Sequence, residues 1–403
     1  MPAMWESVTA QPRCASHPLR ISSHRTMRGT RYHNVFAVWL RGNPASGDDG
    51  PGMIPKTMQA LVKPKPAPGM EMREMPVPMI GPEDVLVAVE TASVCGTDLH
   101  IFHWDEWAQA RIKPPYIPGH EFCGTVAAVG ELVTAVKVGD FVSAEMHVAC
   151  GHCLQCRSGQ AHVCQFVKIL GVDADGAFAH YVRIPATNIW KLDPAIPRDY
   201  GSLFDPFGNA VHPALSGPIA GQTVAVTGCG PIGLFAIAVA KACGASRIFA
   251  IEPNARRRET ARQMGAHVLL DPTSGNVETE VKSATGGNGV DVLLEMSGNA
   301  SAIRQGFSIL RMGGRASLLG IPARNVELDL ANSVIFKGAV VHGINGRKMY
   351  ETWFQAEALI RDSGVDLSPV ITHRMPLAQF DEAMRLLENG EAGKILLTVK
   401  GAV

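Results

Sequence analysis

This chain has no excess charge of either sign. Among its 403 residues, 37 Lys and Arg balance 37 Asp and Glu. A surface that binds nucleic acid or anionic lipid usually appears in a sequence as a surplus of basic residues. The composition therefore predicts neither a nucleic-acid partner nor a membrane partner.

Cysteine is too scarce for a disulfide scaffold, with nine residues in the whole chain. The N-terminus also lacks the apolar core of a cleavable signal peptide. We therefore expect a cytoplasmic protein, and in a reducing compartment a cysteine cluster usually binds metal.

Long runs that are almost free of charge are rare. One of them, "TVAVTGCGPIGLFAIAVAKACGA" (223–245), in which Lys241 is the only charged residue, has a Gly- and Pro-rich break after a short β-prone segment. A buried strand, a tight turn and a buried helix explain this pattern better than a membrane span does.

Hydrophobic residues make up 46% of the chain, and the length suggests about two domains. Residues 1–57 have scattered arginines, few acids and no periodicity, so we expect a disordered leader or a start at Met53 or Met58. A transit peptide is the alternative. Residues 58–210 show short strands between Gly and Pro turns, at 84–94, 123–130, 140–148 and 177–185.

Strands and helices alternate in residues 211–347, which is typical of a doubly wound parallel sheet and hence of an α/β protein. Buried-strand runs occur at 223–228, 247–252, 267–271, 290–298 and 315–321. Helices are predicted between them, including 253–266 and 299–314.

The first strand of this region ends in "GCGPIG", with glycines at 228, 230 and 233. A Gly-rich turn that opens a helix lets the backbone approach a pyrophosphate. Glu252 ends the next strand, where a carboxylate holds ribose hydroxyls and repels a 2′-phosphate. We therefore predict NAD rather than NADP. The arginines at 256–258 argue the other way, because one of them could bind a 2′-phosphate.

Four cysteines, Cys150, Cys153, Cys156 and Cys164, occupy fifteen residues as C-x2-C-x2-C-x7-C. Four thiolates at this spacing predict a closed, tetrahedral and therefore structural zinc site. A C-x-x-C redox pair does not require the third and fourth cysteines.

A second set of potential ligands lies upstream. "CGTDLH" contains Cys95, Thr97 and His100, and "PGHEFCG" contains His120 and Glu121. One Cys, one His and one carboxylate can hold a catalytic zinc with an open position. On spacing alone, a lone Cys and a lone His are more often buried packing residues.

These motifs, in this order, resemble the zinc-dependent medium-chain alcohol dehydrogenase family over residues 58–403. "CGTDLHIFHWDEWAQARI", "FDPFGNAVH", "GINGRKMYETW" and "DLSPVITHR" resemble the branch that oxidises the 3-hydroxyl of L-threonine. The resemblance implies a β-rich, GroES-like catalytic domain at 58–210 with the zinc lobe at 150–164. It also implies a NAD-binding Rossmann domain at 211–347, a segment at 348–403 that returns to the catalytic domain, and a homotetramer.

The same resemblance implies roles for individual residues. Cys95, His120 and Glu121 would bind a catalytic zinc, giving two zincs per chain, and Thr97 and His100 would carry the proton outwards. Asp205 would tune or relay the proton near the metal, with a helix-capping Asp as the alternative. The implied NAD-binding residues are Gly228, Gly230, Ile232, Gly233, Glu252, Arg257, Leu319, Gly320, Ile321, Ile344 and Asn345.

His147 and His152 match positions linked to substrate handling, and structural histidines are the alternative. Cys123, Cys229 and Cys243 are predicted to be packing residues. Two other functions stay open: a polyol or 2,3-butanediol dehydrogenase, and a non-catalytic NAD-binding or zinc-stabilised protein. An intact set of Cys95, Thr97, His100 and His120 argues against the non-catalytic reading.

Overall fold

The structure is a computed structural model that describes residues 54–273 and 275–399. The chain clusters into two units, Met1–Met53 and Ile54–Val403, and the description below concerns the second. The predicted leader at 1–57 lies almost entirely outside the described residues. The boundaries at 210 and 347 stay predictions.

A seven-stranded sheet organises the N-terminal part of this unit. Its order is β16-β17-β3-β4-β5-β9, and β8 pairs with β3 off this path. Its members are β3 (Asp84–Ser93), β4 (Phe122–Val129), β5 (Phe141–Ala144), β8 (Tyr181–Pro185), β9 (Ile189–Lys191), β16 (Ile371–Pro376) and β17 (Lys394–Thr398). Most of its pairs are antiparallel.

Smaller elements surround this sheet. Two further pairs of strands are β1 (Thr57–Val62) with β2 (Glu71–Pro76), and β6 (His147–Val148) with β7 (Lys168–Ile169). The helices are α1 (Gly96–His103), α2 (Glu106–Arg111) and α3 (Leu154–Arg157). Short 3₁₀ segments are η1 (Ala161–Val163), η2 (Ala186–Asn188), η3 (Arg198–Leu203), η5 (Ser368–Val370) and η6 (Leu377–Gln379).

The predicted parallel sheet is confirmed. Its order is β12-β11-β10-β13-β14-β15, and every neighbouring pair is parallel. Its strands are β10 (Thr223–Thr227), β11 (Arg247–Ile251), β12 (Val268–Leu270), β13 (Val290–Glu295), β14 (Leu310–Leu318) and β15 (Val340–Gly343). The order reverses between β10 and β13, which is where such sheets open a crevice for a ligand.

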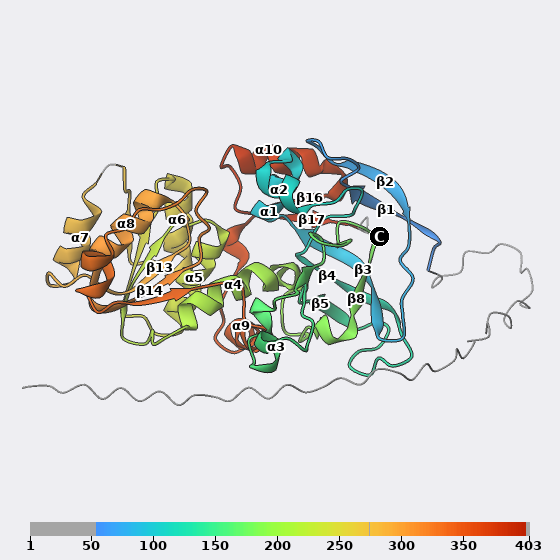
Figure 1. Ribbon diagram of the computed structural model, residues 1–403, viewed down its shortest axis with the longest axis horizontal. Coiled ribbons are helices and arrows are strands. Elements are labelled where there is room, and N and C mark those ends of the chain that lie inside the picture. Colours follow the sequence, from blue (N-terminus) through green and yellow to red (C-terminus); the bar gives the residue numbers. More distant parts are fainter. Residues whose placement is uncertain (1–53, 274, 400–403) are drawn as a thin grey trace, which may run out of the picture. The chain divides into compact units, whose positions relative to one another are not determined.

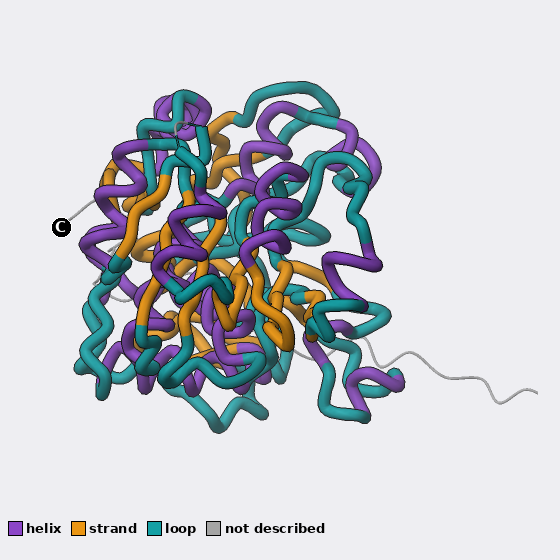
Figure 2. The backbone as a smooth tube through the Cα atoms, turned by 90° about the vertical axis from the view of Figure 1, so that its left-hand side faces the viewer, coloured by secondary structure: helices purple, strands orange, loops and turns teal. Residues whose placement is uncertain are grey.

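Helices pack on both faces of this sheet (Figure 2). They are α4 (Phe204–Leu215), α5 (Pro231–Ala242), α6 (Ala255–Met264), α7 (Val277–Ala284) and α8 (Ala300–Ile309), with a π turn, η4, at Ala331–Ile335. Helix α9 (Glu351–Arg361) packs on α4 and against Trp190 of β9 instead. Successive residues of β10 point to opposite cores: Val224 and Val226 pack with Phe235, whereas Ala225 packs with Phe307. A strand buried on both faces reads as a continuous apolar run.

The C-terminal residues rejoin the first sheet. β17 pairs antiparallel with β3 and parallel with β16. Helix α10 (Phe380–Glu388) lies beside α1 (Figure 1), where the Phe102 and Phe380 rings are 6.2 Å apart. This return places the Lys394 ammonium beside the Val94 carbonyl, which lies 300 residues earlier in the chain.

Several predicted elements differ in extent. The strand expected at 177–185 begins only at Tyr181, and the one expected at 315–321 runs over Leu310–Leu318. Two further differences have a visible cause. The helix expected at 299–314 ends at Ile309, because Leu310 pairs with Val290 and begins β14. The strand expected at 140–148 ends at Ala144, since the Asn188 side-chain amide donates hydrogen bonds to the carbonyls of Glu145 and His147. The charge-poor run forms β10 and α5 as predicted. None of the helices in the described part of the chain has the length and apolarity to span a bilayer.

Candidate active site and metal centres

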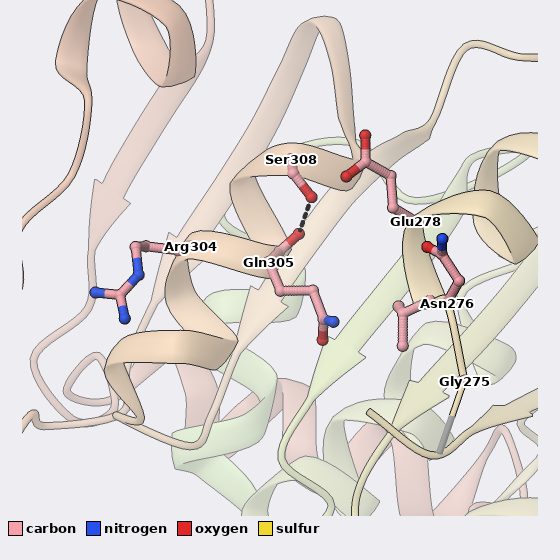
Figure 3. A pocket seen from close by; sticks show the side chains of 7 residues that line it. Gly275, Asn276, Glu278, Arg304, Gln305 and Ser308 are labelled. Carbon is pink, nitrogen blue, oxygen red and sulfur yellow. Dashed lines mark hydrogen bonds between the residues drawn. The ribbon is translucent and has the colours of Figure 1, made fainter. Parts of the chain in front are cut away.

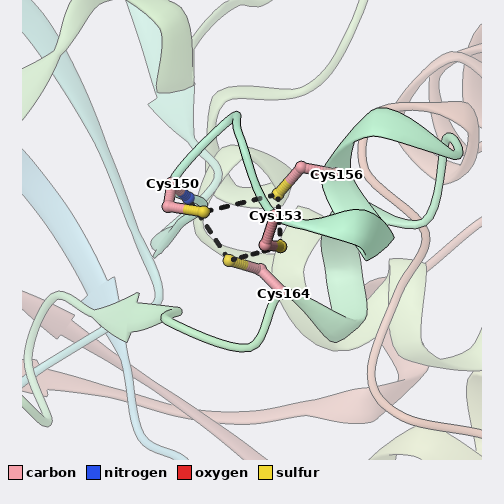
Figure 4. Close-up of side chains that lie close together, drawn as sticks. All are labelled: Cys150, Cys153, Cys156 and Cys164. Atoms are coloured by element: carbon pink, nitrogen blue, oxygen red, sulfur yellow. Dashed lines mark hydrogen bonds between the residues drawn. The ribbon is translucent and has the colours of Figure 1, made fainter. Parts of the chain in front are cut away.

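The four clustered cysteines converge on one point. Cys150, Cys153, Cys156 and Cys164 direct their sulfurs towards one another (Figure 4). Sulfur separations are 3.5 Å for Cys153–Cys156, 3.8 Å for Cys153–Cys164 and 4.0 Å for Cys150–Cys156. A tetrahedron with Zn–S bonds of about 2.3 Å has edges of about 3.8 Å. The lobe therefore fits a zinc ion, and all four cysteines are free of disulfides.

Two backbone amides complete this lobe. The N–H groups of Cys150 and Phe166 both donate to the sulfur of Cys164, each at 3.3 Å. Such bonds stabilise a thiolate, which is the form that binds zinc. Four sulfurs and no further donor leave no open position for a substrate.

Cys95, His120 and Glu121 form the second cluster. Their ligand atoms lie within 4.8 Å of one another, and His120 and Glu121 are buried. Burial alone lowers the pKa of His120, but the neighbouring Cys95, Asp98 and Asp205 raise it to about 10. The surroundings therefore favour a cation, and three protein donors fit a zinc site with one open position.

Three residues that the sequence analysis missed support this cluster. The Glu121 carboxylate accepts hydrogen bonds from Ser93 and from the buried Lys394 ammonium through one oxygen, Oε2. Asp98 Oδ1 and His120 Nδ1 are buried without hydrogen-bond partners and lie 4.0 Å apart. Asp98 Oδ2 accepts from the Cys95 amide at 2.9 Å, which anchors the loop that carries the thiol.

Thr97 and His100 follow Cys95 on helix α1. Thr97 Oγ1 is 3.7 Å from Cys95 Sγ, and His100 lies one helical turn farther on. The His100 side chain is 59% exposed and its Nδ1 is 2.5 Å from Asp105 Oδ2. The helix thus runs from the metal cluster towards solvent.

Asp205 belongs to a buried charge network and does not cap a helix. It lies in the first turn of α4, whose N-cap is Leu203, so the capping alternative is wrong. Arg347 Nη1 is 2.7 Å from Asp205 Oδ2, an ion pair without hydrogen-bond geometry. The same guanidinium grips both oxygens of Glu145, with Nε 2.7 Å from Oε2. Arg347, Glu145 and Asp205 are all buried.

The remaining histidines separate into two settings. His147 contacts the network, with Nδ1 2.9 Å from both Glu145 Oε1 and Arg347 Nη2. His152 lies on the exposed zinc lobe, stacked on Phe166 with ring centroids 6.2 Å apart. Cys123 and Cys229 are buried and Cys243 is half-buried, which fits the predicted packing role.

The three glycines of the turn after β10 serve different purposes. A Cβ on Gly228, whose φ is +83°, would lie 2.7 Å from Ser297, and one on Gly233 would lie 2.0 Å from the Gly228 oxygen. A Cβ on Gly230, the N-cap of α5, would meet nothing within 4 Å. Two glycines therefore allow close packing, and the third leaves open space at a helix N-terminus, as a pyrophosphate requires.

Glu252 lies against this turn. Its carboxylate accepts from the amides of Cys229 at 2.7 Å and Asn254 at 3.0 Å. Arg258 donates to the Glu252 and Pro253 carbonyls and pairs with Asp271. The guanidinium of Arg257 makes no hydrogen bond or ion pair within the described residues. A depression of about 490 Å³ lies at the start of α6, lined by Asn254, Ala255, Arg256, Asn389, Gly390 and Glu391, and Glu252 is not among its lining residues.

The other predicted cofactor residues lie at the same edge of the parallel sheet. Ile232 lies in the first turn of α5, Leu319–Ile321 follow β14, and Ile344 and Asn345 follow β15. A Cβ on Gly320 would lie 2.1 Å from the Gly298 amide, so packing alone accounts for this glycine. Ile321 is 92% exposed, which leaves its side chain available to a ligand.

A larger depression than the one at the start of α6 lies elsewhere. It measures about 640 Å³ between α7 and α8 and is open to solvent (Figure 3). Its lining, which includes Asn276, Glu278, Arg304, Gln305 and Ser308, contains none of the predicted site residues. Volume alone therefore does not locate the chemistry in this molecule.

Comparison with known proteins identifies two matching families. Residues 81–194 match the alcohol dehydrogenase GroES-like domain, and residues 231–362 match the zinc-binding dehydrogenase family. L-threonine 3-dehydrogenase from Symbiobacterium thermophilum is 52% identical over 343 residues, covering 85% of this chain and 98% of that protein.

Solved structures show the same architecture. Alcohol dehydrogenase TADH from Thermus sp. ATN1 is 31% identical with a TM-score of 0.78, covering 85% of this chain and all of that one. The 2R,3R-butanediol dehydrogenase from Bacillus subtilis is 28% identical with the same TM-score and coverage. Structures of other similar chains hold NADP or NADH.

Proposed function

This chain belongs to the zinc-binding alcohol dehydrogenase family, and from that premise we propose that it oxidises the 3-hydroxyl of L-threonine to 2-amino-3-oxobutanoate. The observation that best supports this proposal is the 52% sequence identity of the chain to an L-threonine 3-dehydrogenase over 98% of that enzyme. Identity to the butanediol dehydrogenase is 28%. The shared fold alone does not select a substrate, so the much higher sequence identity decides between the two.

The protein uses zinc and a nicotinamide cofactor. In our proposal each chain holds two zincs, one on Cys95, His120 and Glu121, and one on the four cysteines of the lobe. When bound, the first zinc supplies a Lewis acid that lowers the pKa of the substrate hydroxyl, and the nicotinamide supplies a hydride acceptor. Each donor set matches the ligand types that zinc prefers.

The residues of the chain then hold and move the proton. Thr97 Oγ1 lies beside the Cys95 sulfur. It accepts the proton of the substrate hydroxyl and gives up its own hydroxyl proton towards His100. His100, one turn later and largely exposed, receives that proton and releases it to water, a task that suits an imidazole. Asp205 contributes a negative charge near His120.

A nicotinamide cofactor would be held at the carboxyl ends of the parallel strands. Gly230 would leave room for the pyrophosphate and Glu252 would bind the adenosine ribose, with Ile232 and Arg257 beside them. Leu319–Ile321, Ile344 and Asn345 would hold the nicotinamide side. Because Glu252 is buried and acidic, a 2′-phosphate is disfavoured there and NAD is the preferred form.

The proposed assembly is a homotetramer in the cytoplasm. Edge strand β15 supports self-association, because it pairs on one side only and Val340 and Val341 are exposed, as is Phe336 before them. Light scattering of the purified chain measures the number of subunits directly.

One experiment tests the function. The purified chain is mixed with NAD and, separately, with L-threonine, sorbitol and 2R,3R-butanediol, and NADH absorbance is followed. We expect the highest kcat/KM with L-threonine, with 2-amino-3-oxobutanoate or its decarboxylation product detected by mass spectrometry. A higher kcat/KM with either diol would overturn the threonine assignment.

A further inference from the structure

A tight turn after helix α1 brings an acidic residue back to His100. The helix ends at His103, and Trp104 adopts the left-handed conformation at φ 60°, the only non-glycine residue with positive φ in the described residues. The amides of Trp104 and Asp105 both return to the His100 carbonyl, at 3.0 and 3.4 Å. This capping geometry reverses the chain within two residues.

The turn places Asp105 on the inner nitrogen of the His100 ring. Nδ1 of His100 lies 2.5 Å from Oδ2 of Asp105, a charge-assisted contact. The other oxygen, Oδ1, accepts the Ala108 amide at 3.0 Å, because Asp105 is the N-cap of α2. Each carboxylate oxygen thus has one partner, and α2 fixes the direction in which the carboxylate points.

The carboxylate is held in its charged form. The slight burial of Asp105 alone would raise its pKa, but hydrogen bonds from the Ala108 amide and from His100 lower it below its ordinary value. Trp107, in the first turn of α2, covers the His100 ring with centroids 6.0 Å apart. The ring is therefore held at Nδ1 and lies beside Trp107, while its Nε2 makes no hydrogen bond or ion pair within the described residues.

Two other charged groups around α1 pair with residues other than His100. His103 lies 2.5 Å from Glu388 of α10, and Arg111 of α2 binds Asp173 at 2.8 Å. Within the described part of the chain, Asp105 is the carboxylate that contacts the His100 ring.

We propose that Asp105 is a positioning residue, which keeps the Nδ1 proton of His100 in place so that Nε2 accepts the proton leaving the substrate. This inference rests on the proposed relay through His100. During turnover the hydride and its two electrons go to the nicotinamide. One proton reaches Nε2 and forms an imidazolium, and the same nitrogen then releases it to water. Asp105 orients the ring and stabilises its charged form without taking the proton, as a carboxylate does beside a catalytic histidine.

The test is Asp105→Asn in the full-length, zinc-loaded enzyme. Asparagine caps a helix as well as aspartate does, so α2 keeps its N-cap while the negative charge disappears. We expect kcat for L-threonine oxidation to fall about tenfold, less than the loss of a general base because His100 itself remains. The apparent pKa of the kcat–pH profile should move down by about half a pH unit, the size of an exposed ion pair.

Asp199→Asn is the matched control. Asp199 is also a half-exposed carboxylate in an ion pair, with Arg374, but lies outside the proposed machinery. This variant should keep kcat within about twofold and leave the pH profile in place. Zinc content and the KM for NAD should match the parent in both variants.

His100→Ala separates the possible failures. We expect it to lower kcat by about a hundredfold or more, and Asp105→Asn added to it should cost little further. If His100→Ala leaves kcat unchanged, the relay itself is wrong. If His100→Ala is slow but Asp105→Asn changes neither kcat nor the pH profile, the relay stands and the positioning role is refuted. An equal loss from Asp105→Asn with and without His100 also refutes it, because Asp105 would then act without the histidine.

Discussion

The buried guanidinium of Arg347 gives the sharpest stability prediction. It neutralises Glu145 and Asp205, and Glu145 also accepts a hydrogen bond from the Trp353 indole at 3.0 Å. Replacing Arg347 with Met keeps much of the side-chain volume and removes the charge. Two buried carboxylates then lose their cation, which is the costly way to break a buried ion pair.

The pKa of Glu145 sets the magnitude. Burial alone would raise this pKa, but Arg347, together with His147 and Trp353, lowers it from 4.5 to about 2. At about 1.4 kcal/mol for each pKa unit, this difference corresponds to about 3 kcal/mol of folding free energy at neutral pH. Removing one partner of a buried pair costs about 3–5 kcal/mol in other proteins. We therefore expect Arg347→Met to lower the free energy of unfolding by about 3 kcal/mol at pH 7.

The sign of the pH dependence follows from the same pKa. A carboxyl whose folded pKa is lowered stabilises the protein above its ordinary pKa and loses that contribution as pH falls towards 2. In the variant Glu145 has no cation, so its pKa rises and protonation relieves the penalty. The deficit of Arg347→Met should therefore narrow by about 1 kcal/mol or more between pH 7 and pH 5.

Urea unfolding followed by tryptophan fluorescence measures both quantities, because Trp353 lies in the network. Arg374→Met is the control: it removes a guanidinium from an ion pair with Asp199 in which Arg374 is 55% exposed. Its cost should stay below about 1 kcal/mol at both pH values. Equal losses from the two variants, or a deficit that does not narrow at pH 5, would refute the reasoning.

Three further predictions concern the metals and the cofactor. Elemental analysis of Cys153→Ser should show one zinc fewer per chain, and its Tm should fall, because metal binding at a closed site stabilises the fold. Cys243→Ser should change neither. If Cys153→Ser keeps all its zinc but loses turnover, the lobe is catalytic. Cys95→Ser should abolish threonine oxidation and lose the other zinc, since a hydroxyl is a poor zinc ligand; near-native rates with both zincs bound would contradict the assignment. Glu252→Gln should lower the ratio of kcat/KM for NAD to kcat/KM for NADP, because it removes the charge that repels the 2′-phosphate while keeping an acceptor for the Cys229 amide. An unchanged ratio would mean that another residue sets the cofactor preference, with Arg257 as the next candidate.

Short-range patterns carried most of the fold. The alternation of strand and helix after residue 222, the Gly-rich turn and the four-cysteine segment are local features, each set by a few neighbouring residues. Errors arose where distant residues decide the local structure. Residues 310–314 read as helix by periodicity, yet Leu310 joins the sheet through its pairing with Val290.

The surroundings of the site left no local signal. Lys394 lies 273 residues from Glu121, and Arg347 lies 202 residues from Glu145. In the sequence each is an ordinary charged residue, and such residues are usually solvent-exposed. The contact between His100 and Asp105 spans five residues. The left-handed turn that creates it could not be predicted from the sequence, because the left-handed residue is Trp104 and not a glycine.

By itself the sequence determined which residue types are present at which spacing, and this sufficed for the two candidate zinc sets, the dinucleotide turn and the family. Tertiary structure alone decided which charges meet. A zinc lobe or a glycine turn is built from one continuous segment, so the spacing of its residues is enough to predict what it binds. A buried ion pair is built from segments that the fold brings together, and it is stable only because burial removes the water that would otherwise screen each charge.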